Sequence, residues 1–226
     1  RMEKLAKLPV FWGLEGKRVV LAGGSDGAAW KAELLLACGA ELHLYCEESE
    51  LSESFATLVA KSPMLIWHDR SWGADIFKGA ELALADCGTD EEAERFYHAA
   101  RAAGIPVNVI DKPEFCQFQF GTIVNRSPVV VSISTDGAAP ILAQAIRRRI
   151  ETLLPLALKD WGALAQTIRE RVNLRLVPGP ARRSFWEKFV DRAFTERLDE
   201  GSEERLLADI GPQAGRVGSR AGLVTL

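Results

Sequence analysis

The residues with the clearest chemical potential form a glycine-rich run near the start of the sequence. An apolar segment, Arg18–Ala22, precedes the run, and a helical pattern follows to about Cys38. Glycines between a strand and a helix let the backbone approach a pyrophosphate, which then lies at the helix N-terminus. The run predicts a dinucleotide site, although a plain tight turn has the same pattern. The residues expected to contact the cofactor are Gly23, Gly24, Ser25, Asp26, Gly27 and Ala28.

A dinucleotide site also needs an acidic partner for the ribose hydroxyl groups. That residue is expected roughly 20 residues beyond the glycines, after the second strand. The second strand is predicted at 41–45, and Glu47 and Glu48 follow it. We take Glu47 as the candidate ribose partner, with exposed loop charge as the alternative for both glutamates.

A carboxylate follows another predicted strand, 106–110. Asp111 ends the run Asn108-Val109-Ile110-Asp111, at the sheet edge where parallel α/β folds present catalytic groups. An aspartate in this position is also typical of a turn or a helix cap. The pattern alone does not separate these interpretations.

A loop of small and hydroxyl-bearing residues precedes a long helical pattern that starts at Pro140. Its hydroxyls and backbone N–H groups predict an anion site. Alternatively, Ser134, Thr135 and Asp136 cap the helix, with Pro140 in its first turn.

Composition excludes several classes of function. The 226 residues carry 28 Lys and Arg against 31 Asp and Glu, so a general nucleic-acid binder is not expected. Arginines cluster between Arg147 and Arg183, either as a solvated helix surface or as a cationic wall for an anionic small molecule. His43, His68 and His98 are not at metal-ligand spacing, and no preformed metal site is predicted.

The sequence also predicts where the protein resides. No apolar run reaches the ~18 residues of a membrane span, and no leader pattern is recognised at the start. The four cysteines are isolated from one another and predict reduced thiols. We therefore expect a cytoplasmic protein without a membrane partner.

The chemical residues are positioned by strands that alternate with helices across the first half. This pattern predicts an α/β fold with a parallel sheet covered on both faces. Two β-rich runs at 118–124 and 128–134 follow, and helices are predicted from Pro140 onward. The remaining predicted strands are 64–67 and 80–85, and the remaining predicted helices are 51–61, 90–103, 159–172 and 182–198.

Three stretches resemble the N-terminal region of siroheme synthase, the precorrin-2 dehydrogenase/sirohydrochlorin ferrochelatase family. The first is Leu8-Pro9-Val10-Phe11 with Leu14-Glu15-Gly16-Lys17-Arg18-Val19-Val20, followed by the glycine run and Lys31. The second is Asn108-Val109-Ile110-Asp111 with Arg126-Ser127-Pro128 and Ser134-Thr135-Asp136-Gly137-Ala138-Ala139-Pro140. The third is Arg182-Arg183-Ser184-Phe185-Trp186-Glu187-Lys188-Phe189. Together they span about Leu8 to Thr195 in order.

The resemblance implies a fold, a reaction and a set of site residues. It implies a Rossmann-like NAD domain (1–117), a β-rich dimerisation segment (118–154), a helical domain (155–210) and a homodimer. Precorrin-2 would be oxidised with NAD to sirohydrochlorin, and ferrous iron would then be inserted as a substrate. Asp111 matches the family's acid/base residue. The tetrapyrrole-binding residues would be Asn108, Ser134, Thr135, Asp136 and Gly137.

The sequence departs from the family near the cofactor. Ser25 replaces a loop glycine, Trp30 replaces an arginine before Lys31, and Asp86-Cys87-Gly88 stands where Ala-Thr-Asp is usual. Cys87 is therefore a candidate cofactor contact in an altered crevice. Three alternatives follow: a dehydrogenase without chelatase activity, a non-catalytic NAD-sensing dimer, and a tetrapyrrole-binding protein that has lost NAD use. We interpret the segment 211–226 as a linker towards a missing methyltransferase domain. Gly222–Leu226 resembles the first strand of that domain.

Overall fold

The structure is a computed structural model that describes residues 1–211. It divides into two compact units, Arg1–Phe120 and a second that begins at Gly121. The segment 212–226, which includes most of the predicted linker, lies outside the described residues. The division into four parts made from the sequence is finer than these two units and stays a prediction.

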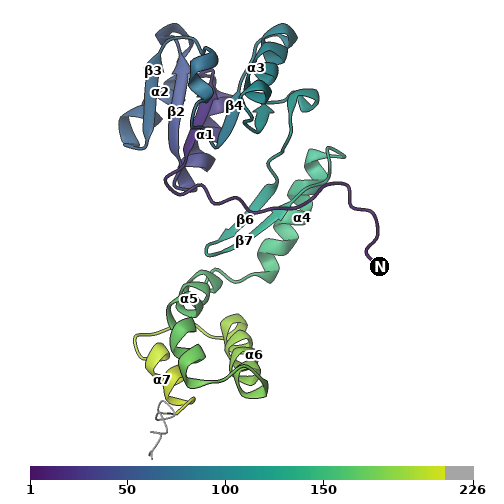
Figure 1. The fold of residues 1–226 in the computed structure, drawn as a ribbon. Coiled ribbons are helices and arrows are strands. Elements are labelled where there is room, and N and C mark those ends of the chain that lie inside the picture. Colours follow the sequence, from purple (N-terminus) through teal and green to yellow (C-terminus); the bar gives the residue numbers. More distant parts are fainter. Residues whose placement is uncertain (212–226) are drawn as a thin grey trace, which may run out of the picture. The chain divides into compact units, whose positions relative to one another are not determined.

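The first unit is a five-stranded parallel sheet with the strand order β3-β2-β1-β4-β5 (Figure 1). Its strands are β1 (Arg18–Ala22), β2 (Glu41–Cys46), β3 (Leu65–Asp69), β4 (Leu82–Ala85) and β5 (Val107–Val109). Its helices are α1 (Asp26–Ala37), α2 (Glu53–Lys61), α3 (Asp90–Ala102) and the short η1 (Glu48–Glu50), η2 (Ala74–Phe77) and η3 (Pro113–Phe115). This arrangement confirms the predicted α/β fold.

Alternation of apolar side chains along the strands covers both faces of the sheet. Leu21 of β1 packs in the cluster with α1 and α2, while its neighbour Val20 packs with α3. Successive side chains of a strand point to opposite faces, so a continuous apolar strand is what a doubly covered sheet requires. Because the strands are parallel, their carboxyl ends lie at one edge of the sheet, and this edge carries the glycine loop and Asp111.

Side-chain caps set where the helices of this unit begin. Ser25, Ser52 and Thr89 accept hydrogen bonds from the backbone N–H groups of Ala28, Phe55 and Glu92, each at 3.2 Å. These bonds satisfy N–H groups that have no partner within the helix. The cap at Ser52 explains why the helix predicted at 51–61 begins at Glu53.

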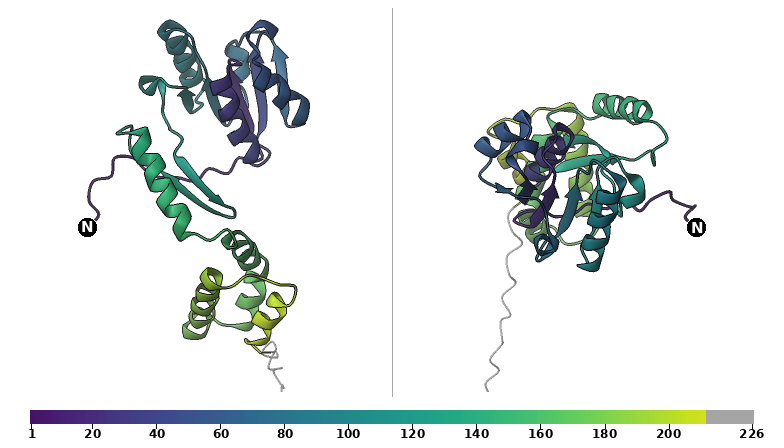
Figure 2. Two further views of the ribbon diagram at one scale, coloured as in Figure 1. Left: turned by 180° about the vertical axis from the view of Figure 1, so that it is seen from behind. Right: turned by 90° about the horizontal axis from the view of Figure 1, so that it is seen from above.

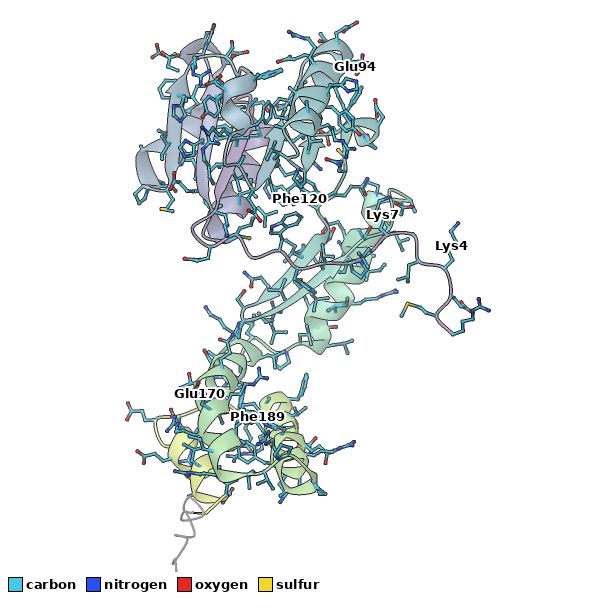
Figure 3. The ribbon with its side chains drawn as sticks, viewed as in Figure 1. Lys4, Lys7, Glu94, Phe120, Glu170 and Phe189 are labelled. Atoms are coloured by element: carbon cyan, nitrogen blue, oxygen red, sulfur yellow. The ribbon has the colours of Figure 1, made fainter. Side chains whose placement is uncertain are left out.

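The second unit pairs a β-hairpin with helices. Strands β6 (Thr122–Arg126) and β7 (Val129–Ile133) are antiparallel, and α4 (Pro140–Leu153) lies along them in Figure 2. Trp161, Phe185 and Phe189 lie in the core of the remaining helices, and Phe189 is labelled in Figure 3. These helices are α5 (Leu158–Arg175), α6 (Pro180–Thr195) and α7 (Ser202–Ala208).

The bounds of several elements differ by a few residues from those predicted. The strand expected at 64–67 is Leu65–Asp69, and the helix expected at 182–198 is Pro180–Thr195, with proline in its first turn. Helix α7 was not predicted, because its seven residues give too few apolar positions for a helical period. Leu206 and Leu207 nevertheless bury it against its neighbours. Among the helices of residues 1–211, none has the length and apolar character needed to cross a membrane.

Candidate functional site

The glycine loop passes close to the ends of two neighbouring strands. A Cβ atom on Gly23, whose φ is +99°, would lie 2.6 Å from the carbonyl oxygen of Asp86. A Cβ on Gly24 would lie 2.8 Å from Cys46 Sγ and 2.9 Å from the carbonyl oxygen of Glu50. Both positions therefore need glycine for backbone packing. This packing holds the N-terminus of α1 at the carboxyl edge of the sheet, the position that receives a pyrophosphate in such folds.

Ser25 joins the loop to the end of β4. Its hydroxyl caps α1 at Ala28 and donates a hydrogen bond to the Asp86 carboxylate. Asp26, Gly27 and the buried Ala28 then form the first turn of α1. These residues fit a dinucleotide in backbone geometry, because the helix terminus and the glycine loop lie together. The Asp86 carboxylate is electrostatically unfavourable for a dinucleotide, because it places a second negative charge beside the expected pyrophosphate.

Glu47 lies directly after β2, as predicted for a ribose partner. It is exposed, and it forms a reciprocal capping box with Glu50 around η1. The loop is held against the glycine run, because the backbone N–H of Ser52 donates to the carbonyl oxygen of Gly24 at 2.8 Å. Cys87, the other candidate cofactor contact, follows β4 and is buried. Burial raises its pKa to about 12. It is therefore a neutral thiol at physiological pH.

Asp111 lies on the same edge, two residues after β5. Its φ of +61° is a left-handed conformation, and its side chain is exposed. Asn108 is only 6% exposed, and its amide donates to the carbonyl oxygen of Phe118 at 2.8 Å. Cys116 bonds the carbonyl oxygens of Val109 and Lys112. These bonds fix the turn that presents Asp111. Through its bond to Phe118, the Asn108 side chain helps to position this turn.

The sequence did not predict the placement of the Lys31 side chain. Its ammonium lies 4.8 Å from the ring centroid of Trp30 and 4.5 Å from that of Phe120. Burial lowers the pKa of Lys31, whereas the charges of Asp111 and then Cys116 act to raise it. The sequence signal was only a lysine after the loop, and Phe120 is distant in sequence.

The loop Ser134–Gly137 belongs to the second unit, whereas the glycine loop and Asp111 belong to the first. Asp136 and Gly137 have φ values of +53° and +77°, and the backbone N–H of Asp136 donates to Ser134 Oγ at 3.2 Å. Thr135 accepts a backbone bond from Ala138 at 3.0 Å. The alternative that these side chains cap α4 is wrong, because Ala139 is the cap residue and no side chain bonds there.

Most of the clustered arginines stabilise the helices of the second unit. Arg175 donates to the carbonyl oxygen of Leu207 at 2.9 Å, and Arg171 pairs with Glu203, which together link α5 to α7. Arg182 bonds the carbonyl oxygen of Leu176. These bonds account for the positions of Arg171, Arg175 and Arg182 without a ligand. Within residues 1–211, no group of three or more His, Cys, Asp or Glu side chains is arranged to hold a metal ion.

Comparison with known proteins places three family models along the chain. A putative NAD(P)-binding family matches residues 10–122, a sirohaem biosynthesis protein central region matches 126–153, and a sirohaem synthase dimerisation region matches 157–210. In this order the models cover the parallel sheet, β7 with α4, and the last helices.

Curated relatives agree with these models. Siroheme synthase of Nitrosomonas europaea is 34% identical over 197 residues, covering 87% of this chain and 41% of the relative. Siroheme synthase of Stutzerimonas stutzeri is 38% identical over 208 residues, covering 89% and 43%. The chain thus spans about two fifths of the length of these relatives.

A solved structure, SirC, precorrin-2 dehydrogenase, matches with a TM-score of 0.65 and 18% identity. The match covers 90% of this chain and 98% of that protein. At this identity the likeness supports the fold.

Proposed function

Because the chain belongs to the family of the siroheme synthase N-terminal region, we propose that it oxidises precorrin-2 to sirohydrochlorin with NAD. The observation that carries the proposal is the exposed Asp111 carboxylate after β5, on the sheet edge that also holds the glycine loop. The match to an NAD(P)-binding family supports a nicotinamide cofactor, and Glu47 after β2 favours NAD over its phosphorylated form.

Different residues would bind the cofactor and accept the proton in this reaction. The backbone from Gly23 to Ala28 would hold the pyrophosphate, and Glu47 the ribose. When bound, the dinucleotide supplies the hydride acceptor. Oxidation of the tetrapyrrole also releases a proton, and Asp111 would accept it as a general base. The left-handed backbone at Asp111 and the bond from Asn108 to Phe118 would keep that carboxylate aimed from the turn.

The test is an anaerobic absorbance assay with precorrin-2, with and without NAD. We expect the sirohydrochlorin spectrum to appear only with NAD. Asp111→Asn should lower kcat by about 100-fold or more, because asparagine cannot accept the proton but tolerates the left-handed backbone. Glu114→Gln, a nearby exposed carboxylate, is the matched control and should retain full activity.

The outcomes separate the alternative functions. Full activity in Asp111→Asn would remove the assigned role of this carboxylate. Absence of turnover with NAD still bound, measured by calorimetry, would favour a nucleotide-sensing dimer. Absence of turnover and of NAD binding, with tetrapyrrole still bound, would favour a protein that has lost its cofactor, as the Asp86 charge would explain.

We propose ferrous iron insertion as a second activity of the same site. Iron entry into sirohydrochlorin requires loss of pyrrole N–H protons, which the Asp111 carboxylate would accept. This step needs no NAD, so anaerobic incubation of sirohydrochlorin with ferrous iron tests it alone. A protein that oxidises precorrin-2 but does not accelerate iron insertion would be a dehydrogenase only.

The assembly we propose is a cytoplasmic homodimer. It is supported by the match of 157–210 to a dimerisation region. Ser134, Thr135, Asp136 and Gly137 would line the tetrapyrrole site in this assembly.

A further inference from the structure

The ammonium of Lys31 occupies an aromatic platform on the first unit. Lys31 is the sixth residue of α1, and the ring faces that it contacts belong to Trp30 of the same helix and Phe120 after η3. Phe120 packs on the cluster formed with α1 and α2, which holds its ring in place. The position of Phe120 at the end of the first unit is labelled in Figure 3.

The ammonium has aromatic contacts in place of an anionic partner. Among residues 1–211, no carboxylate forms an ion pair with Lys31, whereas two ring faces lie within cation–π distance of its ammonium. Lys112, by comparison, has its Nζ 2.6 Å from Asp90 Oδ1. The two lysines therefore differ: one is satisfied by a carboxylate, and the other is held half-buried with donors to spare.

A half-buried ammonium without an oxygen acceptor is costly unless a ligand supplies one. Burial removes part of its hydration, which is why burial lowers the pKa of Lys31. Aromatic faces compensate only in part, since a cation–π contact at a partly exposed site is weak. A bound anion would replace the hydration that the ammonium has lost, and the surrounding rings would exclude water from the contact.

The site of Lys31 is shared with the proposed catalytic carboxylate. The charge of Asp111 acts on Lys31, so the ammonium lies within electrostatic range of the turn after β5. The ring of Phe120, which contacts the ammonium, belongs to the segment that follows this turn and η3. The contact and the charge together associate Lys31 with the segment that carries Asp111.

We propose that Lys31 binds a peripheral carboxylate of the tetrapyrrole substrate and that Trp30 offers its indole face to the macrocycle. This inference rests on the proposed function, because it assigns a substrate contact in the same site. Trp30 is 56% exposed although it is a large aromatic residue, so its ring is available to a flat apolar ligand. The tetrapyrrole has many carboxylates around an aromatic ring, and this combination matches a cation beside two ring faces.

The test measures equilibrium binding of sirohydrochlorin, by its fluorescence, together with steady-state oxidation of precorrin-2. The variants are Lys31→Gln, Lys31→Arg and the matched control Lys112→Gln. Loss of one partly exposed charge-assisted contact predicts about tenfold weaker binding in Lys31→Gln. KM for precorrin-2 should rise by a similar factor with kcat little changed, because the contact is present in ground and transition states alike.

The other variants identify the origin of the effect. Lys31→Arg keeps the charge and should retain most of the affinity, and Lys112→Gln should bind like the unaltered protein. Added salt should weaken sirohydrochlorin binding less in Lys31→Gln, since one charge contact is missing. Circular dichroism checks the fold, and glutamine preserves helix propensity at this position.

Each remaining outcome overturns the inference in a recognisable way. If Lys31→Gln binds sirohydrochlorin like Lys112→Gln while the unaltered protein is active, the inference is wrong and the proposed function stands. If Lys31→Gln weakens NAD binding and leaves sirohydrochlorin binding unchanged, the ligand is a phosphate of the cofactor. If the unaltered protein neither binds the tetrapyrrole nor oxidises precorrin-2, the proposed function fails, and the inference fails with it.

Discussion

At the scale of single residues, the sheet brings two histidines together that are distant in sequence. His43 Nδ1 lies 2.9 Å from His68 Nε2, and His43 Nε2 lies 2.7 Å from Glu41 Oε1. The His68 ring also stacks on Tyr45, with 4.5 Å between ring centroids. The tautomers of the two rings decide which nitrogen donates in the contact between them. These contacts join the two histidines and Glu41 in one polar cluster on β2 and β3.

This cluster predicts a loss of stability in mild acid. Burial lowers the pKa of His68, and the charges of His43, Arg70 and Arg18 lower it further. The unfolded chain therefore binds more protons than the folded chain as pH falls through the ordinary value of 6.5. The free energy of unfolding should fall between pH 7.5 and pH about 5.5, as measured by urea denaturation.

Two variants test the assignment to His68. His68→Gln should show a weaker fall in stability with pH than the unaltered protein. His98→Gln is the control, since His98 is exposed on α3 at 3.6 Å from Glu94 and should keep the full pH dependence. An undiminished fall in His68→Gln would show that another group titrates.

At the scale of elements, the glycine loop shows that two glycines of one motif have different physical roles. Gly24 is buried and faces Cys46 and Glu50 at distances that exclude a Cβ. Gly27 lies in the first turn of α1, where the nearest atom to a Cβ would be Ser25 Oγ at 3.7 Å. Only the first glycine is required by packing between the loop and β2.

Alanine at each glycine should therefore change stability in opposite directions. Gly24→Ala should lower the free energy of unfolding by about 1–3 kcal/mol, because backbone atoms must move to admit the methyl group. Gly27→Ala should raise it by up to about 1 kcal/mol, because alanine loses less backbone entropy in a helix. Chemical denaturation measures both, and equal effects would contradict this account of the loop.

Helix α4 carries apolar residues at helical spacing, and some of them are exposed. The pattern consists of Ile141, Leu142, Ala145, Ile146, Ile150 and Leu153, and Leu154 follows the helix. Ile141 is 80% and Leu153 is 72% exposed in the chain, and Ala143 is the buried residue of this helix. Large apolar side chains that are exposed at both ends of a helix are typical of an interface.

At the scale of the whole molecule, this surface predicts the assembly. We expect a dimer at micromolar concentration in light scattering coupled to size exclusion. The double variant Ile141→Glu with Leu153→Glu should be monomeric, because buried carboxylates without partners are costly. Met64→Glu, on an exposed apolar residue of the first unit, is the control and should remain dimeric. A monomeric unaltered chain, or a dimer in the double variant, would exclude this interface.

The sequence by itself determined the order of the elements and the edge at which the chemistry lies. Alternating apolar periods predict strands and helices, because each period reflects a local backbone geometry. The glycine run and Asp111 could be assigned to the carboxyl edge of the sheet for the same reason. The motif order likewise indicated the family that the three matched models confirm.

Only the tertiary structure decided which side chains from distant parts of the sequence meet. Lys31 contacts Phe120, Ser25 bonds Asp86, and His43 bonds His68. None of these pairs follows from a local period, since each joins residues brought together by strand order and register. Contacts at long sequence separation depend on the packing of the whole sheet, which is not encoded in any short stretch of residues.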